Sequence, residues 1–382
     1  MSPMRLRLDC WGRLEIVDPG FAAVPLLRSI EPGFKVQQAP LPGFARPRLE
    51  RSRHLPAGRT WPQLSQDRTD FLWNLHLELM EQWEQLTEPE PLPVAEVSLL
   101  DVKIELARRL LLSCQLCGHA CGVNRWRGEL GRCGLGPDAK VVSHFVHIAE
   151  EPPINPSFNL QLAGCGLRCR FCQQGEFLDP PNLEAPTLQA DLWPRLRLKG
   201  ARSFSCLGGN PDESLYAILR FLRQAPTPWK LPLVWNCHGY SSPQTLSLLD
   251  GLVDVYVPDY KFGNGRCSQA LAGVADYPDL VQISLPAMLA QQALVIVRIL
   301  VLPGHFQCCH QPALEFLASL PEQERLWVSI RGQYCPDWQI GPEDGDLTRR
   351  VDPAEVLALC HLGRQLGLKL LVDTAGGFDW RR

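Results

Sequence analysis

The amino-acid sequence predicts an α/β protein whose main domain is a partial (β/α)6 barrel, preceded by a cysteine-rich segment and an N-terminal extension. Short apolar runs rich in β-branched residues alternate with helical stretches after residue 157, a pattern typical of parallel sheets with right-handed crossovers. Six or seven such runs are too few to close a barrel of eight strands. Motifs rich in cysteine, glycine or charge follow the runs, at the strand ends where barrel active sites lie.

The segments can be placed in chain order. Helices are predicted over residues 67–86, which carry an apolar stripe of leucines and Trp83, and over 94–112. The predicted strands then follow at residues 158–163, 203–207, 231–235, 253–257, 295–301, 327–330 and 368–372, with the clearest helices between them at 212–224 and 353–366.

We divide the chain into three parts. Residues 1–95 form an N-terminal extension of unknown role, which ends in an acidic, proline-rich linker at 87–93. Residues 96–150 hold a helix and the cysteine-rich metal-binding segment, and residues 151–382 form the partial barrel.

Composition and charge are those of an ordinary globular protein. Apolar residues make up 45% of the 382 residues and charged residues 21%. A net charge of −3 gives no reason to expect a nucleic-acid or membrane partner. The start shows no basic-then-apolar signal, and no run of eighteen apolar residues occurs. The chain has fifteen cysteines, many of them at metal-ligand spacings, which indicates a reducing compartment, so we expect a cytoplasmic protein.

Three cysteines in a C-x₃-C-x₂-C spacing follow the first predicted barrel strand. They are Cys165, Cys169 and Cys172. A compact loop of thiolates suits an iron–sulfur cluster, because iron prefers sulfur and short spacings bring several ligands to one cubane. Three ligands would leave one iron of a 4Fe–4S cluster open to a small molecule. A structural zinc site or buried core cysteines are the alternatives, but zinc wants a fourth protein ligand that the loop does not offer.

A second group of cysteines precedes the barrel. Cys114, Cys117, Cys121 and Cys133 stand in a C-x₂-C-x₃-C-x₁₁-C pattern on glycine-punctuated loops. Four soft ligands suit a second metal, and zinc and an auxiliary iron–sulfur cluster fit the spacing equally. Reduced structural cysteines are the alternative.

A glycine-rich turn follows the second barrel strand. In Gly208-Gly209-Asn210-Pro211, the two glycines let the backbone approach a ligand closely, and the proline opens a helix. Most such turns are only turns, so the motif gains weight from the cysteine loop before it.

Polar residues end the next two strands. Asn236 ends the third strand, where it is either in contact with a ligand or only a turn asparagine before a glycine. Asp259 and Lys261 follow the fourth strand, and a buried pair of this kind is either structural or in contact with a ligand at the barrel mouth.

Arg298 lies inside an apolar strand. A charged residue there is costly unless it is paired, and a carboxylate matches the guanidinium fork. Further along, Ser329, Gln333, Tyr334 and Asp373 end the last strands and are expected to face the substrate.

The remaining candidate ligands are not expected to bind a metal. His144, His147, Glu150 and Glu151 should cap and solvate a connecting strand rather than bind a metal. The cysteines without ligand spacing are taken as ordinary thiols: Cys206, Cys267, Cys308, Cys309, Cys335 and Cys360.

The cysteine loop, with Phe171 before its last cysteine, resembles the signature of the radical S-adenosylmethionine (SAM) enzymes. Other segments narrow the resemblance to the pyruvate formate-lyase activating enzyme-like iron–sulfur proteins, over about Cys114 to Asp373. One such segment runs from Cys121 to Gly134. In the group that begins at Cys114, the second and third cysteines, Cys117 and Cys121, enclose His119 where the family usually has proline and arginine, which makes His119 a spare candidate ligand.

The resemblance implies a role for each strand-end motif. The turn at 208–211 resembles the Gly-Gly-Glu-Pro motif that holds the amine of SAM, with Asn210 in place of the acid. Asn236 matches a strand-end Asn-x-x-Gly-Tyr that meets SAM, and Asp259 and Lys261 match Pro-Asp-x-Lys. Arg298 matches Arg-x-x-Val-x-Pro-Gly-His and would pair with the SAM carboxylate.

Two functions from different classes follow. The resemblance implies a radical SAM enzyme, with a reductant such as flavodoxin or ferredoxin and with hydrogen abstraction from a substrate, of which a glycyl residue of a partner protein is one candidate. The alternative is a non-enzymatic two-cluster electron carrier or a zinc-binding module. A carrier would predict four ligands for each cluster and gives no reason for Gly208, Gly209 or Arg298.

Overall fold

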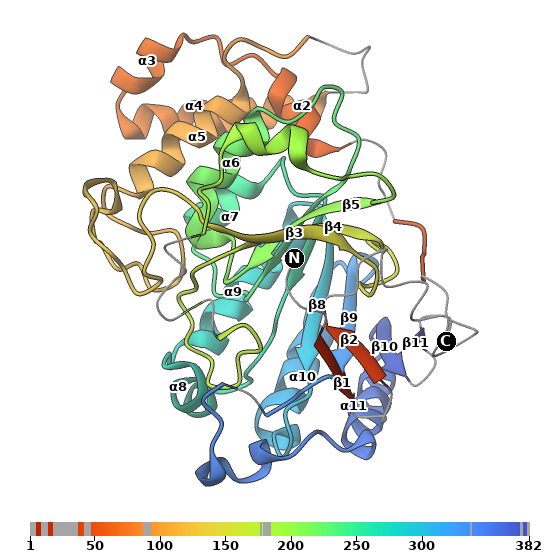
Figure 1. The fold of residues 1–382 in the computed structure, drawn as a ribbon. Coiled ribbons are helices and arrows are strands. Elements are labelled where there is room, and N and C mark those ends of the chain that lie inside the picture. The colour runs from red at the N-terminus through yellow and green to blue at the C-terminus, as the bar shows by residue number, and fades with distance from the viewer. Residues whose placement is uncertain are drawn as a thin grey trace.

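A nine-stranded sheet forms the centre of the computed structural model, in the order β11-β10-β9-β8-β7-β6-β5-β4-β3 (Figure 1). The structure describes residues 5–8, 14–17, 37–41, 47–86, 93–175, 178, 185–336, 338–374 and 377–379. Of residues 5–8, 14–17, 373–374 and 377–379 it describes the backbone alone.

Seven neighbouring strands of the sheet are parallel. They are β4 (Ser157–Leu162), β5 (Ser203–Gly208), β6 (Leu233–Cys237), β7 (Val255–Pro258), β8 (Leu294–Leu300), β9 (Leu326–Arg331) and β10 (Leu370–Thr374). The antiparallel strands β3 (Val141–His147) and β11 (Gly377–Asp379) form the two edges, so the sheet stays open. The predicted partial α/β barrel is therefore confirmed.

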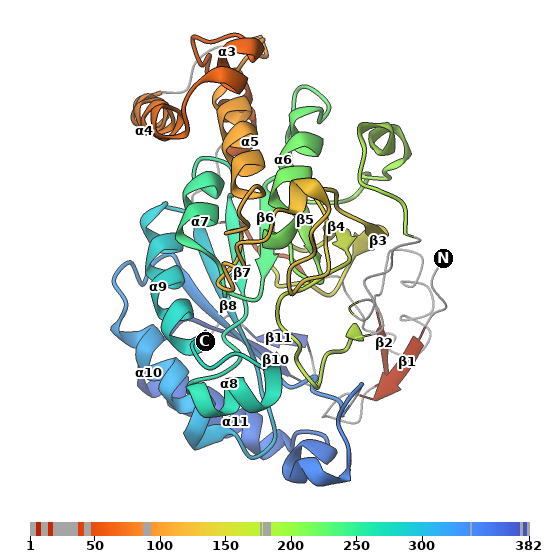
Figure 2. The ribbon, with the colours of Figure 1, turned by 90° about the vertical axis from the view of Figure 1, so that its left-hand side faces the viewer.

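Helices cover the outer face of the sheet. Figure 2 shows α7, α9, α10 and α11 following one another around it. The helices are α6 (Leu215–Arg223), α7 (Pro243–Leu249), α8 (Gly265–Ala272), α9 (Tyr277–Ala290), α10 (Gln311–Ser319) and α11 (Pro353–Gln365). The strands between them are buried on both faces, as β4 is along its whole length, which explains why they read as continuous apolar runs. Short helical turns connect the layers: η2 (Arg125–Arg127), η4 (Ala190–Arg195), η5 (Asp212–Ser214), η6 (Phe306–His310) and η7 (Pro342–Thr348).

The N-terminal helices pack on one end of the barrel, beside α6 (Figure 1). They are α2 (Arg48–His54), α3 (Trp61–Gln66), α4 (Thr69–Gln85) and α5 (Leu99–Leu110), and a separate hairpin pairs β1 (Arg5–Leu8) with β2 (Leu14–Val17). The helices predicted at 67–86 and 94–112 are thus confirmed. Residues 87–92 of the predicted linker lie outside the described residues.

Strand boundaries shift where proline intervenes. The strand predicted at 231–235 begins instead at Leu233, since Pro232 has no N–H to donate to the ladder. Its carbonyl still accepts a hydrogen bond from the Phe204 N–H at 2.9 Å. None of the helices in the described ranges is long and apolar enough to span a bilayer.

Candidate functional site

The loop of Cys165, Cys169 and Cys172 leaves the carboxyl end of β4, as predicted. Cys165 and Cys169 are buried and Cys172 is half-buried. The N–H groups of Arg168 and Arg170 donate to the last carbonyls of α8, at 3.3 and 2.8 Å. These bonds fix the loop against a neighbouring helix, so its thiols are held in place by the fold.

The three thiols are close enough to affect one another's ionisation. Burial raises the pKa of Cys165 well above its ordinary value, and Glu213, Cys169 and Cys172 add to the rise. Burial also raises the pKa of Cys169, to about 12, although Lys261 opposes the rise. Thiols of this kind are neutral until a metal displaces their protons. The donor set and its burial therefore fit an iron–sulfur cluster, in which each thiolate binds a different iron.

The two glycines of the turn at 208–211 are needed for contact with the cysteine loop. A Cβ at Gly209 would lie 1.8 Å from the Gly164 carbonyl oxygen, and Gly208 has a φ of 125° with its Cβ position 2.2 Å from the Leu162 nitrogen. The Gly209 and Asn210 N–H groups donate to Leu162 and Gly164 carbonyls at 2.7 and 2.9 Å. The turn thus supports the start of the cysteine loop, whatever else it contacts.

Gly209→Ala should therefore displace the cysteine loop. The added methyl group would meet backbone, which cannot rotate away, so we expect a loss of about 1–3 kcal/mol of stability and a lower iron content after anaerobic reconstitution. Iron analysis and thermal melting measure the two effects. Gly136→Ala is the control, because a Cβ there meets nothing within 4 Å. Wild-type iron content and melting temperature in Gly209→Ala would contradict this role.

Glu213 was not predicted from the sequence. Its carboxylate lies beside Asn210, the residue that stands where the Gly-Gly-Glu-Pro motif has an acid. Its carboxylate accepts the Gly166 N–H at 2.7 Å and the Asn210 side-chain amide. His238 contacts the same carboxylate through Nε2 at 3.3 Å, while its Nδ1 accepts the Tyr240 N–H. Burial alone would raise the pKa of Glu213, but His238, Asn210 and Gly166 outweigh it and lower the pKa.

Glu213 and His238 lie beside the first cysteine of the loop. The ligand atoms of Cys165, Glu213 and His238 all lie within 4.8 Å of one another. Both ring nitrogens of His238 are already engaged, so the histidine supports the acid instead of serving as a free ligand. The one available signal for Glu213 was its place three residues after Asn210, in the first turn of a helix that returns toward the motif.

The cysteine-rich segment packs directly against this site. Cys114, Cys117 and Cys133 are buried, and Cys121 is exposed. Burial raises the pKa of Cys117, with further contributions from Glu213, Cys133 and Cys114, so these three thiols lie near one another and near Glu213. Burial raises the pKa of Cys133 to about 11.

The spare ligand His119 has a different contact. Its Nε2 donates to the Gly166 carbonyl at 2.9 Å, and Arg132 Nε donates to the same oxygen at 3.1 Å. His119 thus ties the cysteine-rich segment to the Cys165 loop. The two cysteine groups, separate in the sequence, therefore both have members close to Glu213.

Asp259 and Lys261 face the cysteine loop from the end of β7. Their side chains form an ion pair in which Lys261 is 19% exposed. Burial would lower the pKa of Lys261, but Asp259 and the thiols of Cys169 and Cys172 outweigh it and raise the pKa. The lysine is therefore charged and close to two of the three candidate cluster ligands.

Asn236 lies near the carboxyl end of β6, half-buried. Within the described part of the chain its side-chain amide has no hydrogen-bond partner. It is available to a bound molecule, which distinguishes it from Asn210, whose amide nitrogen and oxygen each have a protein partner.

The structure corrects the expectation for Arg298. Its guanidinium pairs with protein carboxylates: Nε donates to Glu151 Oε1 at 2.8 Å, and Nη2 lies 2.6 Å from Glu151 Oε2 and also contacts Glu150. Glu150 and Glu151 are 5% and 0% exposed, so the prediction that they solvate a connecting strand is wrong. Their charge is buried because two arginines neutralise it, the second being Arg331 at 2.9 Å from Glu151.

The other predicted residues have protein contacts or lie partly outside the description. Ser329 Oγ donates to Glu151 at 2.7 Å, and the Tyr334 hydroxyl donates to the Leu347 carbonyl at 2.6 Å. The Gln333 carbonyl accepts from the Gln173 amide at 3.2 Å. Asp373 lies in β10, and its side chain is outside the described residues.

Two of the cysteines taken as ordinary thiols are brought together by the fold. Cys267 and Cys308 lie with His305 in a group whose ligand atoms are all within 4.8 Å of one another. No spacing rule could indicate this pair, because 41 residues separate the two cysteines.

No model of a known protein family matches the chain. The uncharacterized protein MJ0674 of Methanocaldococcus jannaschii is 29% identical over 311 residues, which cover 79% of this chain and 89% of that protein. Among solved structures, SuiB of Streptococcus suis bound to S-adenosylmethionine has a TM-score of 0.38 and 16% identity, over 55% of this chain and 48% of SuiB. SuiB bound to the precursor peptide SuiA gives 0.39 and 17%, over 55% and 46%. The chain spans about half the length of the solved structures it matches, so its activity has to be argued from its own residues.

Proposed function

We propose that the chain is a radical SAM enzyme. Cys165, Cys169 and Cys172 hold a 4Fe–4S cluster, and SAM binds its open iron. The reduced cluster would supply the electron for cleavage of SAM to methionine and a 5′-deoxyadenosyl radical, the chemistry that removes a hydrogen atom from a substrate. The observation that carries the proposal is the arrangement of three mutually close thiols on one fixed loop at the carboxyl edge of a partial parallel barrel.

Neighbouring residues prepare this loop for a cluster. Glu213 holds the Gly166 N–H, and Gly209 lets the turn after β5 pack on Gly164. The Lys261 ammonium, which opposes the rise in the Cys169 pKa, favours the thiolate form that binds iron. Asn236 and the Asp259–Lys261 pair are the candidates for polar contact with SAM, since they stand at the same strand ends as the cysteines.

The sequence motifs support a finer assignment. We place the chain with the pyruvate formate-lyase activating enzyme-like proteins, with flavodoxin or ferredoxin as the reductant and a glycyl residue of a partner protein as the candidate substrate. These assignments rest on the resemblance of the segment from Cys114 to Asp373. Arg298 is left out of the SAM site because its guanidinium is occupied by Glu150 and Glu151.

Product analysis tests the proposed chemistry. Anaerobically reconstituted protein, reduced with dithionite in the presence of SAM, should form 5′-deoxyadenosine and methionine in equal amounts. A two-cluster electron carrier would show the same charge-transfer absorption but neither product, and its spectrum would not change on adding SAM. That outcome would replace the enzyme with a carrier.

The cysteine-rich segment should bind its own metal. A variant with alanine at all three cysteines of the Cys165 loop should still carry iron or zinc, bound by Cys114, Cys117, Cys121 and Cys133. Elemental analysis of the folded variant measures this. A second variant, which also has alanine at Cys117 and Cys133, should lose the metal. Comparing the two variants discounts any metal that is bound elsewhere on the chain. Equal metal content in both would mean that the segment holds structural thiols.

A further inference from the structure

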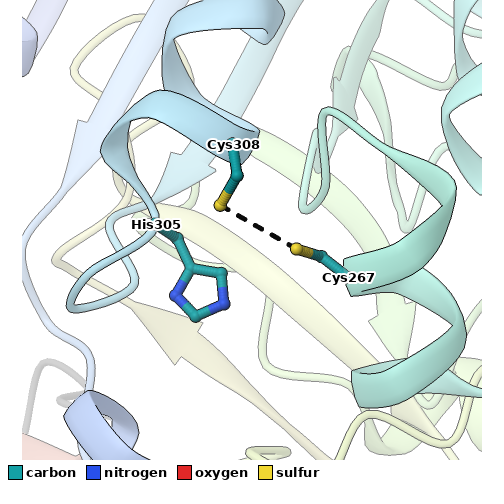
Figure 3. Close-up of side chains that lie close together, drawn as sticks. All are labelled: Cys267, His305 and Cys308. Atoms are coloured by element: carbon teal, nitrogen blue, oxygen red, sulfur yellow. Dashed lines mark hydrogen bonds between the residues drawn. The ribbon is translucent and has the colours of Figure 1, made fainter.

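Three soft ligands from two separate segments meet at the rim of the barrel (Figure 3). Cys267 lies on the first turn of α8, after β7. His305 lies just before η6 and Cys308 lies within it, after β8. The Cys267 and Cys308 sulfurs are 3.8 Å apart. All three side chains are partly accessible, so an ion can reach them from solvent.

The histidine has a nitrogen free for a metal. His305 Nδ1 is 2.8 Å from the Pro303 carbonyl, which only accepts, so Nδ1 carries the proton and donates. Nε2 then keeps its lone pair, the form in which imidazole binds metals. Figure 3 shows the ring turned so that this second nitrogen faces the side of Cys267.

The sulfur spacing matches a tetrahedral ion. Thiolates that bind zinc at about 2.3 Å with tetrahedral angles lie about 3.8 Å apart. That is the spacing of Cys267 and Cys308, and Cys308 and Cys309 are also 3.8 Å apart. Cys309 is buried and lies outside the group of three whose ligand atoms are within 4.8 Å of one another, so its thiol is the candidate for the fourth ligand once a metal draws the segments together. The set of three thiolates and one imidazole is a common zinc environment.

The surrounding residues hold the two segments together. The Asn264 side chain accepts the Cys267 N–H at 2.8 Å and donates to the Cys308 carbonyl at 2.5 Å. A Cβ at Gly263 would lie 2.4 Å from the Cys309 carbonyl oxygen, so the close approach needs glycine. The ligands are thus positioned by contacts between the segments that do not depend on a metal.

We propose that Cys267, His305, Cys308 and Cys309 bind a Zn²⁺ ion that is separate from the proposed iron–sulfur cluster. The ion joins the loop after β7 to the loop after β8. The C-terminal carbonyls of α8 accept the Arg168 and Arg170 N–H groups of the Cys165 loop. Zinc at the other end of α8 therefore also steadies the loop proposed to hold the cluster.

Zinc analysis of the full-length protein, purified anaerobically, tests the site. Cys267→Ser/Cys308→Ser should lose about one zinc per chain relative to wild type, and Cys335→Ser, which replaces a thiol that donates to the Pro336 carbonyl, should lose none. His305→Gln keeps the packing and should lose zinc to a chelator at least about tenfold faster. Absorption at the zinc edge should show mixed sulfur and nitrogen ligands in wild type, with no interference from iron.

Two results would overturn the site. One is an unchanged zinc content in both the double variant and His305→Gln. The other is wild type without zinc whose intact mass, under non-reducing conditions, shows a Cys267–Cys308 disulfide. Neither result depends on SAM cleavage, so a failure of the enzyme proposal leaves this test standing.

Discussion

Alanine at any one of Cys165, Cys169 or Cys172 should abolish the 4Fe–4S cluster and reductive cleavage of SAM in an otherwise folded chain. Two thiolates cannot hold a cubane, since each cysteine binds a different iron. Iron and sulfide should fall by about four atoms each per chain, and 5′-deoxyadenosine should fall to background. Elemental analysis, the visible charge-transfer band and product chromatography measure the three losses.

The fold should survive these changes. Without metal the buried thiols are neutral, because burial raises the pKa of Cys165 and Cys169, so alanine removes a small apolar group and no charge. Serine would be a worse choice, since it would bury an unsatisfied hydroxyl. Cys206→Ala is the matched control: this thiol is buried, as those of Cys165 and Cys169 are, on the neighbouring strand β5, with its pKa raised by burial alone.

The control should melt like the cluster variants and keep its iron. If a single replacement in the Cys165 loop leaves iron, absorbance and SAM cleavage intact, the loop does not hold the cluster. If all four variants lose iron together, the loss follows from general destabilisation.

Strands and loop positions could be predicted because they depend on local pattern. Buried parallel strands read as apolar runs, and the loop of Cys165 follows one of them directly. The exact ends of the strands were predicted less accurately, because a single residue can move a strand end without changing the apolar pattern. The run before Leu233 continues through Pro232, and only the missing N–H of proline moves the strand start.

Partners distant in sequence could not be predicted. Glu151 pairs with Arg298 across 147 residues, and carboxylates on a connecting segment read locally as solvated. The arginine was identified as needing a carboxylate, but nothing in the sequence could say that the protein supplied it. Cys267 and Cys308 pose the same problem, since their ligand geometry comes from two barrel loops that only the fold brings together.

Arg298→Met should destabilise the chain by about 3–5 kcal/mol, because it leaves an uncompensated charge among buried groups. Glu151 would keep Arg331 at 2.9 Å, and Glu150 would keep His147 at 3.1 Å and the Asn159 amide at 3.0 Å. One negative charge would then lack its arginine. Denaturant unfolding of the apo protein measures the loss, and Arg325→Ala, whose partner Glu322 is 41% exposed, should cost only about 0–1 kcal/mol.

Removing the unpaired carboxylate charge from Arg298→Met should restore part of the lost stability. Arg298→Met/Glu150→Gln deletes both partners of one ion pair, which costs less than deleting one. Arg298→Lys keeps the charge but loses the fork that reaches two carboxylates, so its stability should lie between wild type and Arg298→Met. A double variant no more stable than Arg298→Met would mean that the loss comes from packing.

The pH dependence of stability tests the ion pairs of Arg298 independently. Burial alone would raise the pKa of Glu151, but Arg298 and Arg331 outweigh it and lower the pKa to about 2. A lowered carboxyl pKa contributes stability above the unfolded pKa of about 4.3, and this is lost as the pH falls toward the folded value. In Arg298→Met the buried carboxyl pKa should rise, so the variant can bind a proton where wild type cannot. The stability gap between the two should therefore be widest near neutral pH and narrow on acidification toward pH ~4. Normal apo stability of Arg298→Met across this pH range, together with weakened SAM binding, would instead return Arg298 to the cofactor site.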